Sequence, residues 1–386
     1  MAHADATERL RAVLASTEDS VLTRSLDDPS PEVAIAAIRR LAELEGVRAA
    51  AELRGRLLSA DLSLVPELAS ALRKIGDGSA VEVAIAGLQG ERYTRRLAAA
   101  RALGVLRGPR AAGALRAALD DEIAGVRVAA LCALAQIGPD TDAAGDCARL
   151  LSDANSHVRI AAVRAVARTA ARPGAMLAQV ASDPDRVVRL EVARHVAGLP
   201  QPAAGALLAD HDLRVREAAA QGAGMAQVGQ LAALLIEDPA ADVRHAAAKA
   251  LGSLGDERII DVLVSGLEDG DAIVRTAVLC ALERLLTRRG AISRLCRELL
   301  CERRGRRRAS LYALAHLKAT EAADEVGRLA DDPDPDVRLA LIHTADALLP
   351  DPKPLLRYLA ADSDAAVRHA AQIWLLRREH AAGKGS

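Results

Sequence analysis

Histidine and cysteine are the residues of this chain that could carry metal or nucleophilic chemistry, and their spacing favours neither. Nine histidines are scattered from His3 to His380, and none is paired at a four-residue spacing with another histidine or a suitable cysteine. Cys296 and Cys301 are five residues apart, which would place them on different faces of a helix. The chain has no Gly-x-Ser-x-Gly elbow and no Gly-x-x-x-x-Gly-Lys phosphate loop. We therefore expect no metal site, no cofactor and no catalytic residue.

Composition and charge exclude several classes of protein. The 386 residues carry 51 Lys and Arg against 52 Asp and Glu, which argues against a general coat for nucleic acid or membrane but leaves room for a local basic patch. No run of 18 apolar residues occurs, and the N-terminal segment is charged throughout, so we expect neither a membrane span nor a signal peptide. Five cysteines without a framework spacing indicate reduced thiols in the cytoplasm, and the Ala-, Arg- and Gly-rich composition is typical of a GC-rich bacterial source.

A repeat of about thirty residues organises the chain. The dipeptide Val-Arg returns at steps of 27 to 32 residues, with one double step of 63 that Arg307-Arg308 would fill. Stepping backwards adds Arg95-Arg96, Leu64-Val65 and Val33-Ala34, which makes twelve repeats. The Val-Arg pairs begin at Val126, Val158, Val188, Val215, Val243, Val274, Val337 and Val367.

Each repeat reads as a helix, a tight turn and a second helix. Counting the Val as position 0, small or apolar residues fall at positions 3, 4, 7, 8 and 11, which is one face of a helix. A shorter apolar helix precedes the turn. Five residues before position 0 stands an aspartate in most repeats, with Glu302 in its place in the tenth. Asp185, Asp212, Asp271, Asp334 and Asp364 lie where the second helix should begin, as N-cap residues do.

This pattern resembles HEAT repeats, specifically the short kind found in phycobilisome lyases, from about Asp19 to Arg378. The resemblance implies an all-α fold, a right-handed α-solenoid of about twelve helical hairpins. We expect a single array, with residues 1–18 as an N-terminal helix or cap, 19–378 as the repeats and 379–386 as a flexible tail.

The resemblance also implies a structural ladder between the turn aspartates and the helix arginines. When the family's ladder is carried over to this sequence, each turn aspartate pairs with the arginine six residues later. The ladder is expected to be incomplete in the first three repeats, at Ala34, at Ser59 with Val65, and at Gly90. The expected pairs are Asp121 with Arg127, Asp153 with Arg159, Asp183 with Arg189, Asp210 with Arg216, Asp238 with Arg244, Asp269 with Arg275, Asp332 with Arg338, and Asp362 with Arg368.

Positions that vary between repeats are the candidates for function, because HEAT resemblance implies that the second helix lines the concave side. Position 6 is often basic and never acidic, and position 2 adds two histidines. These residues could form a discontinuous basic stripe that receives an acidic protein segment, or they could be ordinary solvated surface. The stripe comprises Arg39, Arg101, Arg164, Arg194, His245, Lys249, His343 and His369.

A second basic feature lies where the repeat pattern is weakest. Residues 288–308 contain nine arginines, opposed by Glu298 and Glu302. Such a patch could bind an acidic protein, nucleic acid or anionic lipid, or be solvated, and only Tyr312 is nearby to stack on a base. The patch comprises Arg288, Arg289, Arg303, Arg304, Arg306, Arg307 and Arg308.

Three enzyme families use HEAT-like repeats, and the residues of this chain fit each of them poorly. Deoxyhypusine hydroxylase-like proteins hold iron with His-Glu dyads, and this chain has no His-Glu dipeptide. Alkylation-repair glycosylases need flat side chains around a base, and the only tryptophan here is Trp374. Bilin lyases grip a large chromophore, for which a groove without Phe is poorly suited. We expect a non-catalytic scaffold or adaptor that binds a protein, with a lyase-like chromophore attachment factor or a nucleic-acid-binding protein as alternatives.

Overall fold

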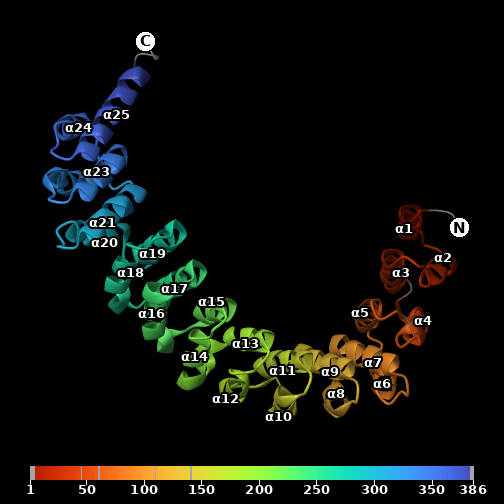
Figure 1. The fold of residues 1–386 in the computed structure, drawn as a ribbon. Helices are drawn as coiled ribbons and strands as arrows, with labels where there is room; N and C mark the ends of the chain where they lie inside the picture. Colours follow the sequence, from red (N-terminus) through yellow and green to blue (C-terminus); the bar gives the residue numbers. More distant parts are fainter. Residues whose placement is uncertain (1–4, 45, 60, 109, 140, 383–386) are drawn as a thin grey trace. The chain divides into compact units, whose positions relative to one another are not determined.

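The computed structural model describes residues 5–382, except 45, 60, 109 and 140. In these ranges every regular element is a helix, so the expectation of an all-α fold is confirmed. Contacts between residues divide the chain into two units, Met1–Ala206 and Leu207–Ser386. Each unit is an array of helical hairpins (Figure 1).

The N-terminal unit begins with one helix, α1 (Ala6–Ala15), which lies in the segment expected to cap the array. Six pairs of helices follow. The pairs are α2 (Asp19–Ser25) and α3 (Pro31–Leu44), α4 (Ala50–Arg56) and α5 (Val65–Ile75), α6 (Ser79–Gly87) and α7 (Tyr93–Leu106), α8 (Ala111–Ala117) and α9 (Ala124–Ile137), α10 (Thr141–Arg149) and α11 (Ser156–Thr169), and α12 (Gly174–Leu177) and α13 (Arg186–Ala193).

The remaining six pairs bring the number of hairpins in the described ranges to the predicted twelve, and the fold is an α-solenoid. They are α14 (Gln201–Leu208) and α15 (Leu213–Gly222), α16 (Val228–Glu237) and α17 (Ala241–Leu254), α18 (Ile260–Gly266) and α19 (Ala272–Leu285), α20 (Arg288–Glu298) and α21 (Arg304–His316), α22 (Ala323–Gly327) and α23 (Pro335–Leu348), and α24 (Lys353–Leu359) and α25 (Ala365–Ala382).

The C-terminal end differs from the expected tail. Residues 379–382 are helical, because α25 continues to Ala382, and 383–386 lie outside the described residues.

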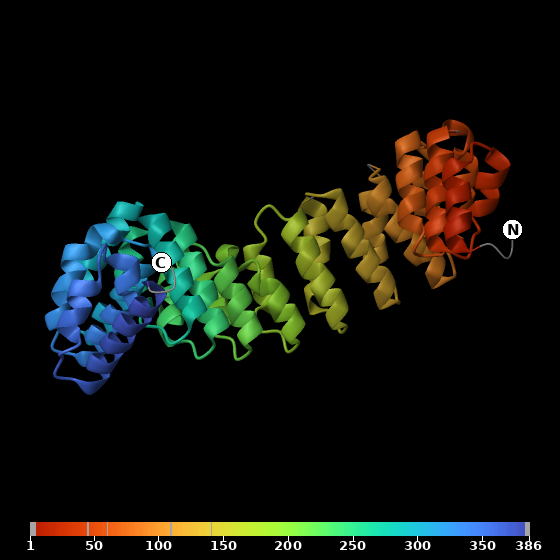
Figure 2. The same cartoon turned by 90° about the horizontal axis from the view of Figure 1, so that it is seen from above.

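Within each unit the helices form two layers. The second helices of successive hairpins pack on one another, as α7 does on α9 and α17 on α19. They form one layer, which we call the second-helix layer, and the first helices form the other (Figures 1 and 2). Within each unit most second helices therefore contact their own first helix and a neighbouring second helix, which is the contact pattern of a linear repeat array.

Aspartate side chains start many of the second helices, as their positions in the sequence predict. Asp212 accepts the backbone N–H of Arg214 at 2.9 Å, and Asp185 accepts that of Val187 at 2.7 Å. These bonds satisfy amides that have no carbonyl partner inside the helix. The turn before each second helix is therefore defined by local side-chain chemistry rather than by packing alone.

The core between neighbouring second helices is thin because it consists largely of alanine. On α9 the residues Val126, Ala130 and Leu134 are at most 1% exposed. Gly104 on α7 allows the two helices to approach closely, since a Cβ atom there would lie 2.9 Å from the Cα of Ala133. A backbone atom cannot swing aside as a flexible side chain can, so this position requires glycine.

Replacing Gly104 by alanine tests this helix packing. We expect Gly104→Ala to lower the free energy of unfolding by about 1–3 kcal/mol through overpacking against α9. A Cβ atom at Gly145 on α10 would have no atom within 4 Å, so Gly145→Ala should instead raise it by about 0.5–1 kcal/mol through helix propensity. Urea unfolding followed by circular dichroism measures both. If the two substitutions changed the free energy of unfolding equally, the close approach of α7 and α9 at Gly104 would be contradicted.

Candidate partner-binding surfaces

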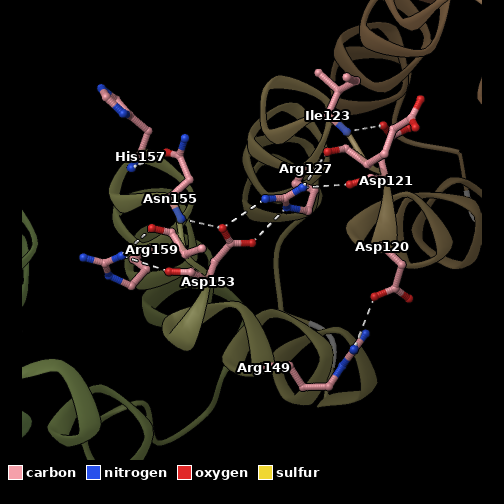
Figure 3. Close-up of polar contacts among 11 residues, drawn as sticks. Asp120, Asp121, Ile123, Arg127, Arg149, Asp153, Asn155, His157 and Arg159 are labelled. Atoms are coloured by element: carbon pink, nitrogen blue, oxygen red, sulfur yellow. Dashed lines mark hydrogen bonds and ion pairs between the residues drawn. The ribbon is translucent and has the colours of Figure 1, made fainter.

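A ladder of arginine and aspartate side chains connects many of the neighbouring hairpins. Arg127 donates from Nε and Nη2 to the carboxylate of Asp153 in the next repeat, at 2.9 and 3.0 Å (Figure 3). Its Nη1 donates to the backbone carbonyl of Asp121 in its own repeat, at 2.8 Å. Asp153 also accepts the N–H of Asn155 at 2.8 Å. One guanidinium thus binds its own turn and the following turn together.

The ladder corrects the pairing expected from the sequence. Asp121 and Arg127 do meet, but through the backbone carbonyl of Asp121, and the same holds for Asp153 with Arg159 at 2.9 Å. The carboxylate of each ladder aspartate binds the arginine of the preceding repeat. The pairs with Nε–Oδ distances of 2.6–2.9 Å are Arg96–Asp121, Arg127–Asp153, Arg159–Asp183, Arg216–Asp238, Arg244–Asp269, Arg307–Asp332 and Arg338–Asp362.

The ladder is interrupted near the N-terminus, where the sequence places Ala34 and Val65 at the arginine position. Arg9 of α1 bonds Asp28 at 2.8 Å, and the regular pairing resumes at Arg96. Between them the repeats are linked by other ion pairs, such as Arg54 with Asp77 at 2.6 Å. Where Ala34 and Val65 stand at the arginine position, less regular ion pairs therefore link the repeats in place of the ladder.

The predicted basic stripe is divided between the two units, and glutamates offset part of the charge of its N-terminal part. Arg164 and Arg194 both bond Glu191, at 3.0 and 2.9 Å, and Arg39 bonds Glu67 at 2.9 Å. Arg101 donates to the carbonyl of Leu62. These arginines are exposed, as predicted, and three of them are paired with only two glutamates, because Arg164 and Arg194 share Glu191.

In the C-terminal unit two residues of the stripe line a pocket between α17 and α19. His245 and Lys249 of α17 and Arg284 of α19 line it together with an apolar floor, and its volume is about 430 Å³. The floor includes Ile273, whose side chain is 64% exposed, and Ala277. No ion pair joins Lys249, Arg284 or His245 to another described residue. His343 and His369 are exposed on α23 and α25, outside this pocket.

Two arginines of the predicted basic patch are not free surface groups, and this part of the prediction is wrong. Arg307 is 8% exposed and pairs with Asp332 at 2.7 Å, so it is a ladder residue. Arg306 points at Glu298, 3.4 Å away, and at the hydroxyl of Ser265, 2.7 Å away. Glu298 itself is 5% exposed.

The other arginines of the patch are partly paired. Arg288 bonds Glu321 at 2.6 Å and Arg304 bonds Asp334 at 3.2 Å. Arg289, Arg303 and Arg308 are exposed and form no ion pair with a described residue. The local excess of positive charge is therefore much smaller than the run of arginines suggests.

The register of the tenth repeat also needs correction. Arg307 is the ladder arginine, so position 0 of this repeat is Arg306. The aspartate position is therefore Cys301 rather than Glu302. Position 6 is Tyr312 rather than Ala313. The spacing contained this signal, since Arg307 is 32 residues after Arg275 and 31 before Arg338. Arg96 was left out of the expected ladder because Gly90 occupies the aspartate position of its own repeat, whereas its carboxylate partner is Asp121 of the next repeat.

The cysteine of position 6 in the fourth repeat shows no sign of activation. Burial raises the pKa of the Cys132 thiol, although nearby Arg164 and Arg101 act to lower it. A thiol with a raised pKa has little thiolate at neutral pH and is a poor nucleophile.

Metal-binding clusters and membrane-spanning helices are both absent from the described residues. Nowhere in the described ranges do three or more His, Cys, Asp or Glu side chains gather as a metal ion would require. Among the described helices, none has the length and apolar character needed to cross a membrane.

Comparison with known proteins finds HEAT repeats in two segments of the chain. The model of HEAT repeats matches residues 81–167 and 228–300, so these two segments, one in each unit, are HEAT repeats. Among solved structures the chain is similar to YibA of Escherichia coli, with 21% identity, 73% of this chain and 97% of that chain covered, and a TM-score of 0.46. It is also similar to an engineered protein, with 20% identity, 91% and 96% covered, and a TM-score of 0.34. No curated protein matches its sequence significantly.

Removing one ladder carboxylate should cost far more than removing an exposed ion pair. We expect Asp153→Ala to lower the free energy of unfolding by about 2–4 kcal/mol, because Arg127 loses its bidentate partner in a largely desolvated position. Arg110 and Glu82 in the same unit are both more than half exposed, at 72% and 52%, so Arg110→Ala should cost less than about 1 kcal/mol. Urea unfolding measures the free energy of unfolding of both variants. Similar losses in the two would show that the ladder stabilises the fold no more than an exposed ion pair does.

Acid should weaken the ladder. The hydrogen bond from Arg338 lowers the pKa of Asp362 from its usual 3.8 despite burial, and Arg9 does the same for Asp28. Because the folded pKa is the lower one, the stabilisation is complete above the unfolded pKa and is lost as the pH falls through the folded value. We expect a melting temperature that is nearly constant from neutral pH to about pH 5 and falls steeply below about pH 4. A fall already near pH 6 would instead point to histidines.

Proposed function

We propose that this chain is a non-catalytic protein-interaction scaffold that binds an acidic segment of a partner protein on the second-helix layer of its C-terminal unit. The observation that carries the proposal is the pocket between α17 and α19. His245, Lys249 and Arg284 line this pocket, and none of them forms an ion pair with a described residue. Cations held apart from carboxylates in this way are complementary to an acidic ligand.

The floor of the same pocket favours a protein segment over a nucleic acid. Ile273, Ala277 and Ala281 offer apolar surface to a side chain, and the lining residues include no Phe, Tyr or Trp ring on which a base could stack. A peptide that alternates acidic and aliphatic residues would place its charges on the basic rim and its apolar groups on the floor.

The finer assignments follow from the same reasoning. We propose scaffolding rather than the chromophore attachment of phycobilisome lyases, because the lining residues include no Phe, Tyr or Trp ring to pack on a conjugated ring system. The five cysteines are free thiols, which fits a reducing cytoplasm, and the composition fits a GC-rich bacterial source.

Charge reversal in the pocket tests the proposal. A fluorescein-labelled peptide of glutamate and leucine should bind the full chain, as measured by fluorescence anisotropy at physiological salt. We expect the double variant Lys249→Glu with Arg284→Glu to weaken this binding at least about tenfold, because two attractive contacts become repulsive.

The matched control makes the same change of charge on the other layer. Lys353 and Arg357 are exposed on α24, a first helix of the same unit, and Lys353→Glu with Arg357→Glu should leave the affinity nearly unchanged. Equal weakening in both double variants would reduce the effect to net charge and contradict the proposed site. A labelled random DNA duplex that binds more tightly than the peptide, with strong dependence on salt, would favour a nucleic-acid-binding function instead.

A further inference from the structure

The ladder of the C-terminal unit lacks one carboxylate. Arg275 of α19 donates to the backbone carbonyls of Asp269 and Gly270, at 2.7 and 3.0 Å, as the other ladder arginines do in their own turns. In the next repeat the aspartate position is occupied by Cys301, whose carbonyl accepts from Arg307 at 2.8 Å. In the part of the chain that the structure describes, no carboxylate lies within ion-pair distance of Arg275. The guanidinium is oriented for a pair that the tenth repeat does not complete.

The contact between the ninth and tenth repeats is unusual in a second way. Position 0, a buried valine in most repeats, is Arg306 here, and it is held by Glu298, Ser265 and Glu268. Glu298 also pairs with Arg294 at 2.8 Å. A polar network of α18 and α20 with α21 therefore surrounds the position that a buried valine holds in most repeats.

A groove of about 470 Å³ lies between α19 and α21 at this junction. Arg275, Thr276 and Leu279 line it from α19, and Arg308 and Tyr312 line it from α21. Arg308 is exposed and forms no ion pair with any described residue. The groove thus combines two unneutralised guanidinium groups with the apolar side chain of Leu279 and an aromatic ring that is 43% exposed.

The two carboxylates at the edge of the groove do not cancel this charge. Asp269 is bound by Arg244 at 2.6 and 2.9 Å. Glu268 lies against Gly305, where an added Cβ atom would be 2.2 Å from its Oε2, and it pairs with Arg306 at 3.7 Å. Both acids are balanced by arginines outside the groove, so the groove keeps a positive character.

We propose that this groove binds a carboxylate side chain from an acidic peptide segment, and that the ligand completes the ladder at Arg275. The carboxylate takes the place that a ladder aspartate holds in the other repeats, with Arg308 as a second cation. An aliphatic neighbour in the peptide packs on Leu279 and Tyr312. A carboxylate is the matching ligand because the same guanidinium edge binds a planar carboxylate in seven other repeats of this chain.

This subsite names where the partner's acid docks, so it rests on the proposed scaffold function. It differs from the pocket between α17 and α19, with which it shares only Ala272 and Thr276 of α19. A peptide that crosses α19 could occupy both, with its charges on Lys249 and Arg284 at one side and on Arg275 and Arg308 at the other.

Supplying the missing carboxylate from within the chain is the sharpest test. Cys301→Asp should pair internally with Arg275, raise the melting temperature of the full chain, and weaken binding of the glutamate–leucine peptide at least about tenfold by filling the subsite. Cys301→Ser is the matched control, since it changes the thiol without adding charge, and it should leave both quantities unchanged.

A second variant, outside the turn that contains Cys301, tests whether the loss of binding comes from the groove itself. Arg308→Gln removes one exposed cation from the groove and should weaken peptide binding severalfold with no change in melting temperature. Wild-type affinity in Cys301→Asp or in Arg308→Gln would overturn the subsite while leaving the proposed function intact. A wild-type chain that does not bind the peptide at all would end both.

Discussion

A guanidinium that bonds its own turn through a carbonyl and the next turn through a carboxylate is the interaction on which this array depends. The helices are rich in alanine, so each contact between neighbouring repeats buries little apolar surface. Arg127 and its equivalents add a directional, bidentate bond at the same place in successive repeats, which sets the register of one hairpin on the next. The remaining surface residues are placed by this register.

Much of the fold could be predicted because its determinants are local. The spacing of small residues indicated the second helices, and Asp212 and its equivalents marked their first turns. The partner of each ladder residue could not be predicted, since a strict repeat makes a contact inside one repeat and a contact between two repeats look alike. Only the three-dimensional structure distinguishes Arg127 with Asp153 from Arg127 with Asp121.

The candidate site was harder to predict than the fold for the same reason. A basic residue at a variable position is a binding group only if no neighbour neutralises it, and neighbours in an array are about thirty residues away in sequence. Glu191 pairs with both Arg164 and Arg194, whereas Lys249 has no such neighbour among the described residues. Arg307 shows the opposite error, because a ladder residue in a run of arginines looks like surface charge.

Ala34 and Val65 occupy the position that a ladder arginine holds in later repeats. Their presence affects which part of the array unfolds first under thermal motion. A linear array is coupled only between nearest neighbours, so weak coupling at one end lets that end unfold while the rest remains native. The link between α3 and α5 relies on Arg39, which is 60% exposed, whereas the link between α9 and α11 relies on the desolvated pair of Arg127 and Asp153. Backbone amides of the first repeats should therefore exchange with solvent hydrogen by local openings, long before those in the middle of the same unit.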